Sequence, residues 1–577
     1  MRDIVLAAKK WSMIHALQNV LQAKDGNLVI MAEIIIPEIY TRENNTDHNG
    51  QRVPISSTKQ FNYGTAGFRA NAAHLPFIVF RVGYLAGIRA RYLDQTIGVM
   101  ITASHNPIED NGVKIIDPMG GMLDATWENY ANLIVNASDS DFLEKSQELR
   151  LQFNGRIGEN ANVFTAIDTR PSSKYIEEAA FHGAQCARFS ELSQLREPLR
   201  IEITTMIKRL LTTPQLHYIV RCQNDYTYGS PTEAGYYAKV HNALAAGYTM
   251  WKTYTPTLYL DCANGVGAQK IGLMCTGWPT LVVNIVNVQE PLLNDQCGAD
   301  YVKLEKKFPR NFDKIQAFER CAAFDGDADR LVYFYRNASN EFVLIDGDKI
   351  AALFAKYIKE TGYANGNSTK FLKNEMVSTN MESLIFSYAV DDADFGIHVC
   401  CVATGIKNLQ KEAIKYDIAV YFEANGHGTV YFSPRFYDIM RTIITHKDEV
   451  DQKIEIERLL CFSKLLNTVV GDAMTDLLAV EILLKHYDWT IENWNRIIDT
   501  IVTKYCNGRS FVRPSGTEDV LRIYAEAATE RDAEAIANEV EVAIYEMFYM
   551  SGNASDEQLS ERHTSEMTHR SHMNYKC

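Results

Sequence analysis

The chain has 577 residues, 46% of them hydrophobic, which is enough to form several domains that each bury a core. Its formal net charge of −14 and its isoelectric point near 5.6 argue against a nucleic-acid partner, because binding to phosphate backbones requires clustered Lys and Arg. We therefore expect an acidic, multidomain, cytoplasmic protein.

The amino-terminal segment is a poor match to a secretory signal. It carries Arg2, Lys9 and Lys10 but no unbroken apolar core before a small-residue cleavage site. The apolar run 28–37 contains Glu33 and is too short to span a bilayer, so we expect no membrane partner. The 11 cysteines are scattered without a C-x-x-C pair, a pattern typical of reduced thiols rather than of disulfides or a zinc site.

The first candidate functional loop follows a short apolar run, Ile97–Ile101. It is Thr-Ala-Ser-His-Asn-Pro at 102–107 and is followed by Lys114. Ligands of open α/β sheets gather at the carboxyl ends of strands, so Ser104 is a candidate nucleophile there. A Ser in a turn is more often a helix cap or a solvated side chain, and this loop alone does not decide between the two.

Two segments between the first and second loops predict regular structure. Residues 175–187 have the apolar spacing of an amphipathic helix. Residues 258–260 predict a strand that enters the Gly-containing stretch 261–267 before a helix. That stretch is a weak phosphate-loop signal and is more typical of a tight strand-to-helix connection.

The second loop contains three Asp residues between apolar strands predicted at 321–324 and 331–335. Asp325, Asp327 and Asp329 occupy alternate positions, so their carboxylates would point the same way in an extended segment. Converging carboxylates repel one another, and a divalent cation removes that penalty. A solvated acidic turn is the alternative, but the apolar strands on both sides disfavour it.

The nature of this metal site follows from its ligands. A calcium-binding EF-hand is excluded, because Arg330 and Arg336 stand where that loop requires Gly and Glu. Carboxylate oxygens on a short loop favour Mg²⁺, which commonly bridges protein and phosphate. The second loop therefore points to phosphoryl chemistry.

The third loop follows the apolar strand predicted at 418–422. Its Glu423, Asn425 and His427 offer an acceptor, an amide and an imidazole, the mixture needed to bind sugar hydroxyls. A Gly-rich polar turn after a strand is common, so this signal is weak on its own.

The fourth loop, Arg-Pro-Ser-Gly-Thr-Glu at 513–518, lies between strands predicted at 510–512 and 520–525. An anion could be held by the Arg fork, the two hydroxyls and the backbone N–H groups around Gly516. A plain hairpin turn is the alternative. Farther on, residues 532–547 predict a helix, and the polar tail 551–577 predicts disorder.

The four loops are separated by roughly the length of a domain, which suggests one functional loop per domain and a shared cleft. In this order they resemble the signature loops of the α-D-phosphohexomutases, from about Tyr63 to about Met547. The amino-acid sequences of four segments are similar to those of the phosphoacetylglucosamine mutase branch of that superfamily: 63–69, 211–218, 298–303 and 422–427.

The resemblance implies a fold and a reaction. The fold is three related α/β domains plus a smaller C-terminal α+β domain around a central cleft. The reaction interconverts N-acetylglucosamine 6-phosphate and N-acetylglucosamine 1-phosphate, for UDP-N-acetylglucosamine biosynthesis. The expected partner is a small amino-sugar phosphate, with no obligate protein partner evident.

Domain boundaries follow from the loops and the resemblance. We expect an N-terminal extension at 1–57, α/β domains at 58–222 (phosphoserine loop), 223–345 (metal loop) and 346–490 (sugar-binding loop), a C-terminal phosphate-binding domain at 498–550 and a disordered tail at 551–577.

The resemblance also implies roles for single residues. Phosphorylated Ser104 would transfer its phosphoryl group, with N-acetylglucosamine 1,6-bisphosphate as intermediate and primer. The ligands of one Mg²⁺ would be Ser104, Asp325, Asp327 and Asp329. The catalytic candidates are Ser104, His105, Lys114, Arg69, Arg330 and His427. The substrate-binding candidates are Thr404, Gly405, Glu423, Asn425, Arg513, Ser515, Gly516 and Thr517.

Two departures from the branch leave alternatives open. Ala403 stands where a Lys is usual, and the connection 494–505 before the last domain is short. A sugar-phosphate-binding homologue with impaired catalysis is therefore one alternative. A phosphoglucomutase or phosphomannomutase is another.

Overall fold

The computed structural model describes most of the chain between 34 and 496, together with two hairpins outside that range. The hairpins are β1 (Leu21–Lys24) with β2 (Asn27–Ile30), and β17 (Arg509–Pro514) with β18 (Leu521–Glu526). The gaps are 154–160, 188–208, 249–256, 277–280, 289–291, 364–373, 379–397, 403–404 and 447–449. The helix predicted at 532–547 and the tail predicted at 551–577 lie outside the described residues.

The first sheet has the strand order β3 (Phe68–Asn71), β5 (Asp110–Ile116), β4 (Thr96–Ile101), β6 (Asn162–Ile167) and β7 (Arg209–Leu210). The last three strands are parallel, and β5 is antiparallel to both of its neighbours.

Helices cover both faces of the first sheet, because its apolar side chains alternate between two cores. Val99 and Ile101 share one core with α2 (Leu75–Leu93), α3 (Ala125–Asn136), α4 (Asp139–Gln152) and α5 (Ser173–Cys186). Met100 points the other way, into a core that includes α6 (Thr213–Asn224). The helix predicted at 175–187 corresponds to α5.

Residues 34–57 pack against the first domain, although the sequence predicts an extension there. Ile34, Tyr40 and Ile55 belong to the core of α2 and α5. The guanidinium of the buried Arg42 donates to Val135 O at 3.1 Å, and Asn45 Nδ2 donates to Ala73 O at 2.8 Å. Packing is therefore continuous across residue 57 in this part of the chain.

The second sheet has the order β12 (Phe342–Ile345), β11 (Leu331–Arg336), β10 (Arg320–Phe324), β8 (Thr257–Asp261) and β9 (Val282–Val286). The last three are parallel, and β11 is antiparallel to both neighbours. One face packs against α9 (Ala299–Glu305), the other against α7 (Glu233–Tyr248) and α8 (Gly267–Cys275). The stretch 261–267 connects β8 to α8, as predicted for a tight strand-to-helix connection.

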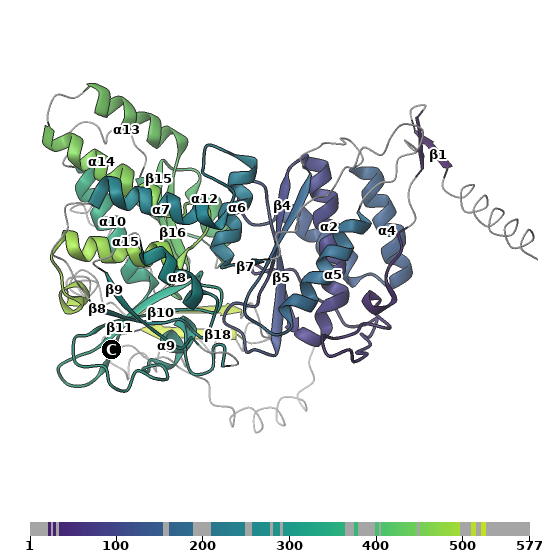
Figure 1. The fold of residues 1–577 in the computed structure, drawn as a ribbon, viewed down its shortest axis with the longest axis horizontal. Helices are drawn as coiled ribbons and strands as arrows, with labels where there is room; N and C mark the ends of the chain where they lie inside the picture. Colours follow the sequence, from purple (N-terminus) through teal and green to yellow (C-terminus); the bar gives the residue numbers. More distant parts are fainter. Residues whose placement is uncertain are drawn as a thin grey trace, which may run out of the picture.

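The third sheet has the order β14 (His398–Cys401), β13 (Asn374–Ser378), β15 (Ile418–Phe422) and β16 (Gly428–Phe432), with only β16 antiparallel. Its helices are α10 (Gly347–Tyr363), α12 (Ile406–Ala413), α13 (Pro434–His446), α14 (Val450–Leu465) and α15 (Ala473–His486). Figure 1 shows these helices grouped on the side of the molecule away from α2 and α5, with α6 between the two groups.

The three sheets place their functional loops in the same position. Strands β4, β10 and β15 each have a parallel neighbour on one side and an antiparallel neighbour on the other. Each is followed by a predicted functional loop, which connects it to its antiparallel neighbour. The predicted α/β fold class is confirmed, and the predicted domain boundaries stay predictions.

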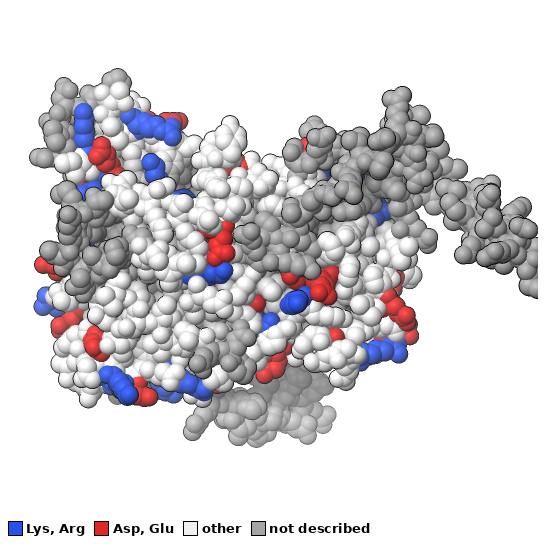
Figure 2. All heavy atoms as spheres, in the orientation of Figure 1, with Lys and Arg blue, Asp and Glu red and all other residues white. Residues whose placement is uncertain are grey.

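Neither a membrane-spanning helix nor a disulfide is present among the described residues. On the face shown in Figure 2, the described Lys and Arg side chains are interspersed with Asp and Glu rather than gathered in one block.

Candidate active site

The Ser104 loop of the first sheet touches the Asp loop of the second. The side chain of Ser104 is buried, and its Oγ donates to Asp325 Oδ2 at 2.5 Å. Ser104 has a φ of 51°, in the left-handed region that non-Gly residues rarely adopt. A Cβ on Gly326 would lie 2.5 Å from Ser104 O, so only Gly allows the two loops to approach this closely.

Side chains from two other segments hold the backbone of the Ser104 loop. Asn294 Nδ2 donates to Ser104 O at 2.8 Å and to Asn106 O at 3.0 Å. Arg170 Nη2 donates to the same two oxygens, at 3.2 and 2.7 Å. Arg170 is itself paired with the buried Asp168. The left-handed backbone of Ser104 is thus fixed by its surroundings.

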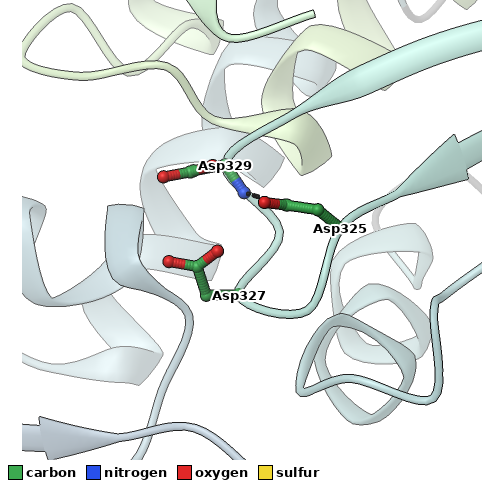
Figure 3. Close-up of side chains that lie close together, drawn as sticks. All are labelled: Asp325, Asp327 and Asp329. Carbon is green, nitrogen blue, oxygen red and sulfur yellow. Dashed lines mark hydrogen bonds between the residues drawn. The ribbon is translucent and has the colours of Figure 1, made fainter. Parts of the chain in front are cut away.

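Asp325, Asp327 and Asp329 are buried and converge, with potential ligand oxygens that all lie within 4.8 Å of one another (Figure 3). The loop is a tight turn rather than the extended segment assumed from the sequence, and Ala328 has a φ of 57°. The backbone N–H groups of Asp329 and Arg330 fold back to donate to Asp325 Oδ1, at 3.0 and 3.2 Å. The prediction of convergence is right, but its assumed cause is wrong.

These carboxylates fit a divalent metal ion. Asp327 Oδ1 is buried and has no hydrogen-bond partner among the described residues. Burial, followed by the charges of Asp329 and Asp327, raises the pKa of Asp325 well above its usual value. A hard cation would satisfy the lone oxygen and remove the mutual repulsion, and a carboxylate oxygen set suits Mg²⁺.

Basic side chains line the rim of the carboxylate cluster. Lys114 Nζ, on β5, lies 3.8 Å from Asp327 Oδ2 and 3.7 Å from Asp329 Oδ2. His427 Nδ1 lies 3.2 Å from Asp329 Oδ1. Burial alone would raise the pKa of Asp329, but His427, Lys114 and Arg330 hold it well below its usual value. The rim therefore favours negative charge at the centre of the site.

Asp300, in the first turn of α9, connects two predicted catalytic residues. It accepts a hydrogen bond from Arg330 Nη1 at 2.5 Å and lies 3.4 Å from His105 Nδ1. Burial and then the charge of Arg330 lower the pKa of His105 to about 3, so this imidazole is neutral at pH 7. Arg69 Nη1 donates to Asn106 Oδ1 at 3.2 Å, which places Arg69 against the Ser104 loop.

The sugar loop joins the metal loop. Asn425 Nδ2 donates to Glu423 Oε2 at 3.2 Å, and His427 N donates to Asn425 Oδ1 at 2.9 Å. Leu331 N, at the start of β11, donates to Gly426 O at 3.0 Å. A Cβ on Gly426 would lie 2.0 Å from Leu331 O, and its φ of 88° also favours Gly. These contacts hold His427 against Asp329.

The segment at 405–407 lies between the first and third sheets. Gly405, with a φ of 117°, precedes α12 and faces Thr65. Lys407 Nζ donates to Leu123 O at 2.6 Å and to Glu128 Oε1 at 2.5 Å. This Lys therefore joins the third sheet's region to α3.

The structure brings the predicted catalytic and metal-binding residues together. Those in mutual contact, directly or through one neighbour, are Ser104, His105, Arg69, Lys114, Arg330, His427 and the three Asp residues. Glu423 and Asn425 lie in the adjoining loop. The backbone of Arg513 lies in β17, and Thr404, Ser515, Gly516 and Thr517 lie outside the described residues. The individual roles stay predictions.

Residues that sequence reasoning did not select also contact the site. Asn294 and Arg170 hold the Ser104 loop, Asp300 binds Arg330, and Thr213 binds Asp327. Thr213 and Asp300 fall in segments 211–218 and 298–303, which carry the family resemblance. The family resemblance was the signal that could have identified Thr213 and Asp300, because the residues that they bind are distant in sequence.

Models of known domain families match in the expected order. Phosphoglucomutase/phosphomannomutase α/β/α domain I matches residues 85–141, and the C-terminal domain of the same group matches 465–543. Phosphoacetylglucosamine mutase AMG1 domain II matches 227–332, and its domain III matches 346–489. Together with the three converging loops, these matches define an α-D-phosphohexomutase, an enzyme of the isomerase class.

Whole-chain relatives narrow this class. A phosphoacetylglucosamine mutase of Candida albicans is 37% identical over 554 residues, which cover 83% of this chain and 95% of that protein. A crystal structure of an N-acetylglucosamine-phosphate mutase in the product complex is 38% identical, with a TM-score of 0.74, and covers 84% of this chain and 97% of its own. The Aspergillus fumigatus enzyme, in complex with GlcNAc-6P and magnesium, is 37% identical, with a TM-score of 0.73 and coverages of 85% and 96%. The chain belongs to the phosphoacetylglucosamine mutase family.

Proposed function

We propose that this protein interconverts N-acetylglucosamine 6-phosphate and N-acetylglucosamine 1-phosphate through a phosphorylated Ser104. The observation that carries the proposal is the contact of Ser104 Oγ with Asp325 at 2.5 Å, on a backbone held in the left-handed region beside three converging carboxylates. Family membership and the substrate of the Aspergillus relative support the choice of amino sugar.

The chemistry comprises two transfers. In the first, the free hydroxyl of the sugar phosphate attacks the phosphorus on Ser104. An O–P bond to the sugar forms as the Ser104 O–P bond breaks, the sugar hydroxyl loses its proton to a base, and Ser104 Oγ is left to be protonated. The product is N-acetylglucosamine 1,6-bisphosphate. This intermediate then reorients in the site so that its other phosphate faces Ser104. That phosphate is transferred to Ser104 by the reverse chemistry.

The surrounding residues would stabilise charge and move the proton. Mg²⁺ held by Asp325, Asp327 and Asp329 would supply Lewis-acid stabilisation of the transferring phosphoryl oxygens. Arg330 and Arg69 would bind those oxygens from the protein side. Lys114 and His427 are the candidates for proton transfer. His427 Nε2 is buried without a hydrogen-bond partner among the described residues, so it has a nitrogen available to a sugar hydroxyl.

Glu423, Asn425, Thr404 and Gly405 would bind the sugar. Arg513, Ser515, Gly516 and Thr517 would hold the phosphate that is not reacting, at either end of the sugar. Because Ala403 and residues 497–505 of the connection 494–505 lie outside the described residues, the impaired-homologue alternative is decided by experiment. A cytoplasmic location stays a prediction.

The test is ³¹P NMR of the protein with Mg²⁺, N-acetylglucosamine 6-phosphate and a trace of the 1,6-bisphosphate. We expect the 1-phosphate signal to appear. Ser104→Ala should reduce turnover at least about a thousandfold, because it removes the group that carries the phosphoryl. Ser146→Ala is the matched control, since it removes a buried hydroxyl in α4 that has no hydrogen-bond partner among the described residues.

Other outcomes would select the alternatives. Sugar-phosphate binding without turnover in a folded protein would favour the impaired homologue. Faster turnover of glucose 6-phosphate or mannose 6-phosphate than of N-acetylglucosamine 6-phosphate would favour a phosphoglucomutase or phosphomannomutase.

A further inference from the structure

The first residue of α6, Thr213, binds the middle residue of the metal loop through two hydrogen bonds. Its backbone N–H donates to Asp327 O at 3.2 Å, and its Oγ1 donates to Asp327 Oδ2 at 2.6 Å. Thr213 and Asp327 are both fully buried. One residue of the first domain therefore fixes both the backbone and the side chain of a predicted metal ligand in the second sheet.

The two carboxylate oxygens of Asp327 have different surroundings. Oδ2 accepts from Thr213 and lies 3.8 Å from Lys114 Nζ. Oδ1 is buried and has no hydrogen-bond partner among the described residues. Rotation of the carboxylate would break the bond to Thr213 and leave its hydroxyl unsatisfied in a buried site, so the hydroxyl selects Oδ1 as the oxygen available to a metal ion.

The hydroxyl of Thr213 is not needed to begin the helix. That role belongs to Thr212, whose Oγ1 accepts from Gln215 N at 3.2 Å, while Gln215 Oε1 accepts from Thr212 N at 3.1 Å. This reciprocal cap satisfies the first turn without Thr213. Gln215 Nε2 also donates to Tyr237 Oη at 3.2 Å, which ties the start of α6 to α7. The backbone of Thr213 is thus fixed by the cap, and its hydroxyl is available to donate to Asp327.

We propose that Thr213 is a positioning residue that orients Asp327 toward the divalent metal ion of the active site. The inference deepens the proposed mutase function and rests on it for its catalytic consequence. Its structural part concerns metal binding alone and can be tested without turnover. A hydrogen-bond partner that fixes a ligating carboxylate commonly contributes ten- to a hundredfold in metal affinity.

The experiment compares Thr213→Val, which keeps the branched shape and removes the hydroxyl, with Thr213→Ser, which keeps the hydroxyl. Mn²⁺ binding is measured by electron paramagnetic resonance, and the Mg²⁺ concentration for half-maximal activity is measured in parallel. We expect Thr213→Val to weaken Mn²⁺ binding and raise the Mg²⁺ requirement by about ten- to a hundredfold. Thr213→Ser should bind Mn²⁺ like the unmodified protein, and at saturating Mg²⁺ the sugar-phosphate KM of Thr213→Val should change little.

The matched control is Thr165→Val. Thr165 Oγ1 also donates from a buried position to a buried carboxylate, Glu177 Oε1, at 2.5 Å, but in the first sheet and α5. This variant reports the cost of losing such a bond away from the metal loop, and it should retain Mn²⁺ affinity. If Thr213→Val does not fold, the smaller Thr213→Ala is measured in its place.

Two results would overturn the inference. One is a folded Thr213→Val or Thr213→Ala protein with unchanged Mn²⁺ affinity. The other is an unmodified protein that binds no Mn²⁺. An unmodified protein that binds Mn²⁺ but turns over no sugar phosphate would refute the mutase proposal instead, and the Mn²⁺ comparison would still decide the role of Thr213.

Discussion

The Ser104 loop and the metal loop occupy the same position in two sheets, yet they are held in different ways. In the Ser104 loop, Asn294 and Arg170 donate to backbone carbonyl oxygens. In the metal loop, backbone N–H groups of Thr213 and Ala473 donate to Asp327 O and Ala328 O, each at 3.2 Å. The shared strand position brings the two loops together. The surrounding hydrogen-bond donors then hold each loop in the conformation that its function requires.

The difference has a functional meaning. Side-chain donors fix the backbone around Ser104, so that its Oγ can remain aimed at Asp325. Donors from α6 and α15 fix the metal loop from two other parts of the fold, so that its carboxylates converge despite their repulsion. Substitutions that disturb the Ser104 loop and substitutions that disturb the metal loop should therefore affect kcat and Mn²⁺ affinity to different extents.

The largest effect should come from the metal loop itself. Asp327→Asn keeps the shape of the side chain and an oxygen for Thr213, but it removes the charge that a divalent cation requires. We expect Mn²⁺ binding to be lost and turnover to fall at least about a thousandfold. Electron paramagnetic resonance and ³¹P NMR measure the two quantities. Retention of both would show that the Asp cluster is not a metal site.

A smaller effect should come from the support of the Ser104 loop. Asn294→Asp keeps the left-handed backbone, with a φ of 58°, but places a carboxylate against Ser104 O and Asn106 O. We expect kcat to fall about ten- to a hundredfold, because the nucleophile is displaced. Mn²⁺ affinity should fall less than kcat, because the three Asp ligands of the metal loop are unchanged. Steady-state kinetics measures kcat, and Mn²⁺ titration measures the metal affinity.

The control for this variant is Asn340→Asp, which changes an exposed Asn with a φ of 67° in the turn between β11 and β12. It should leave kcat unchanged. An equal loss of kcat and Mn²⁺ affinity in Asn294→Asp would show that a change in the support of the Ser104 loop also disturbs the metal loop.

The sequence was enough to predict the strands that lead into the described loops. Runs such as Ile97–Ile101 and 418–422 are apolar and β-branched, and each breaks into a polar turn, as β4 and β15 do. Ser104 and His427 lie on these turns, whereas Arg69 lies on β3 and Lys114 on β5. Local pattern and family resemblance together selected them.

The supporting residues could not be predicted from local sequence pattern. Thr213 is 114 positions from Asp327, and Asn294 is 190 positions from Ser104, so no local pattern relates them. The turn that gathers the Asp residues depends on the left-handed φ of Ala328, which alternation along the chain does not reveal. Similarly, residues 34–57 resemble an extension in sequence but pack on α2 and α5.

The smallest effect should come from α15, whose first residue supports the metal loop. Asp476, on this helix, is fully buried, and neither carboxylate oxygen has a hydrogen-bond partner among the described residues. Burial and then the charge of Asp472 raise its pKa well above the usual value. Because the folded protein retains this proton where the unfolded chain releases it, the stability contributed by Asp476 falls as the pH rises above about 4.

Asp476→Asn removes this titration. We expect the free energy of unfolding of the variant to exceed that of the unmodified protein by roughly 1–3 kcal/mol at pH 7, and the difference to vanish near pH 4. Urea unfolding between pH 4 and pH 8 measures it. Mn²⁺ affinity should be unchanged, because Ala473 N, not Asp476, contacts the metal loop. A stability difference that does not vary with pH would show that Asp476 is ionised in the folded protein, whereas weaker Mn²⁺ binding would show that the buried acid and the metal loop are coupled through α15.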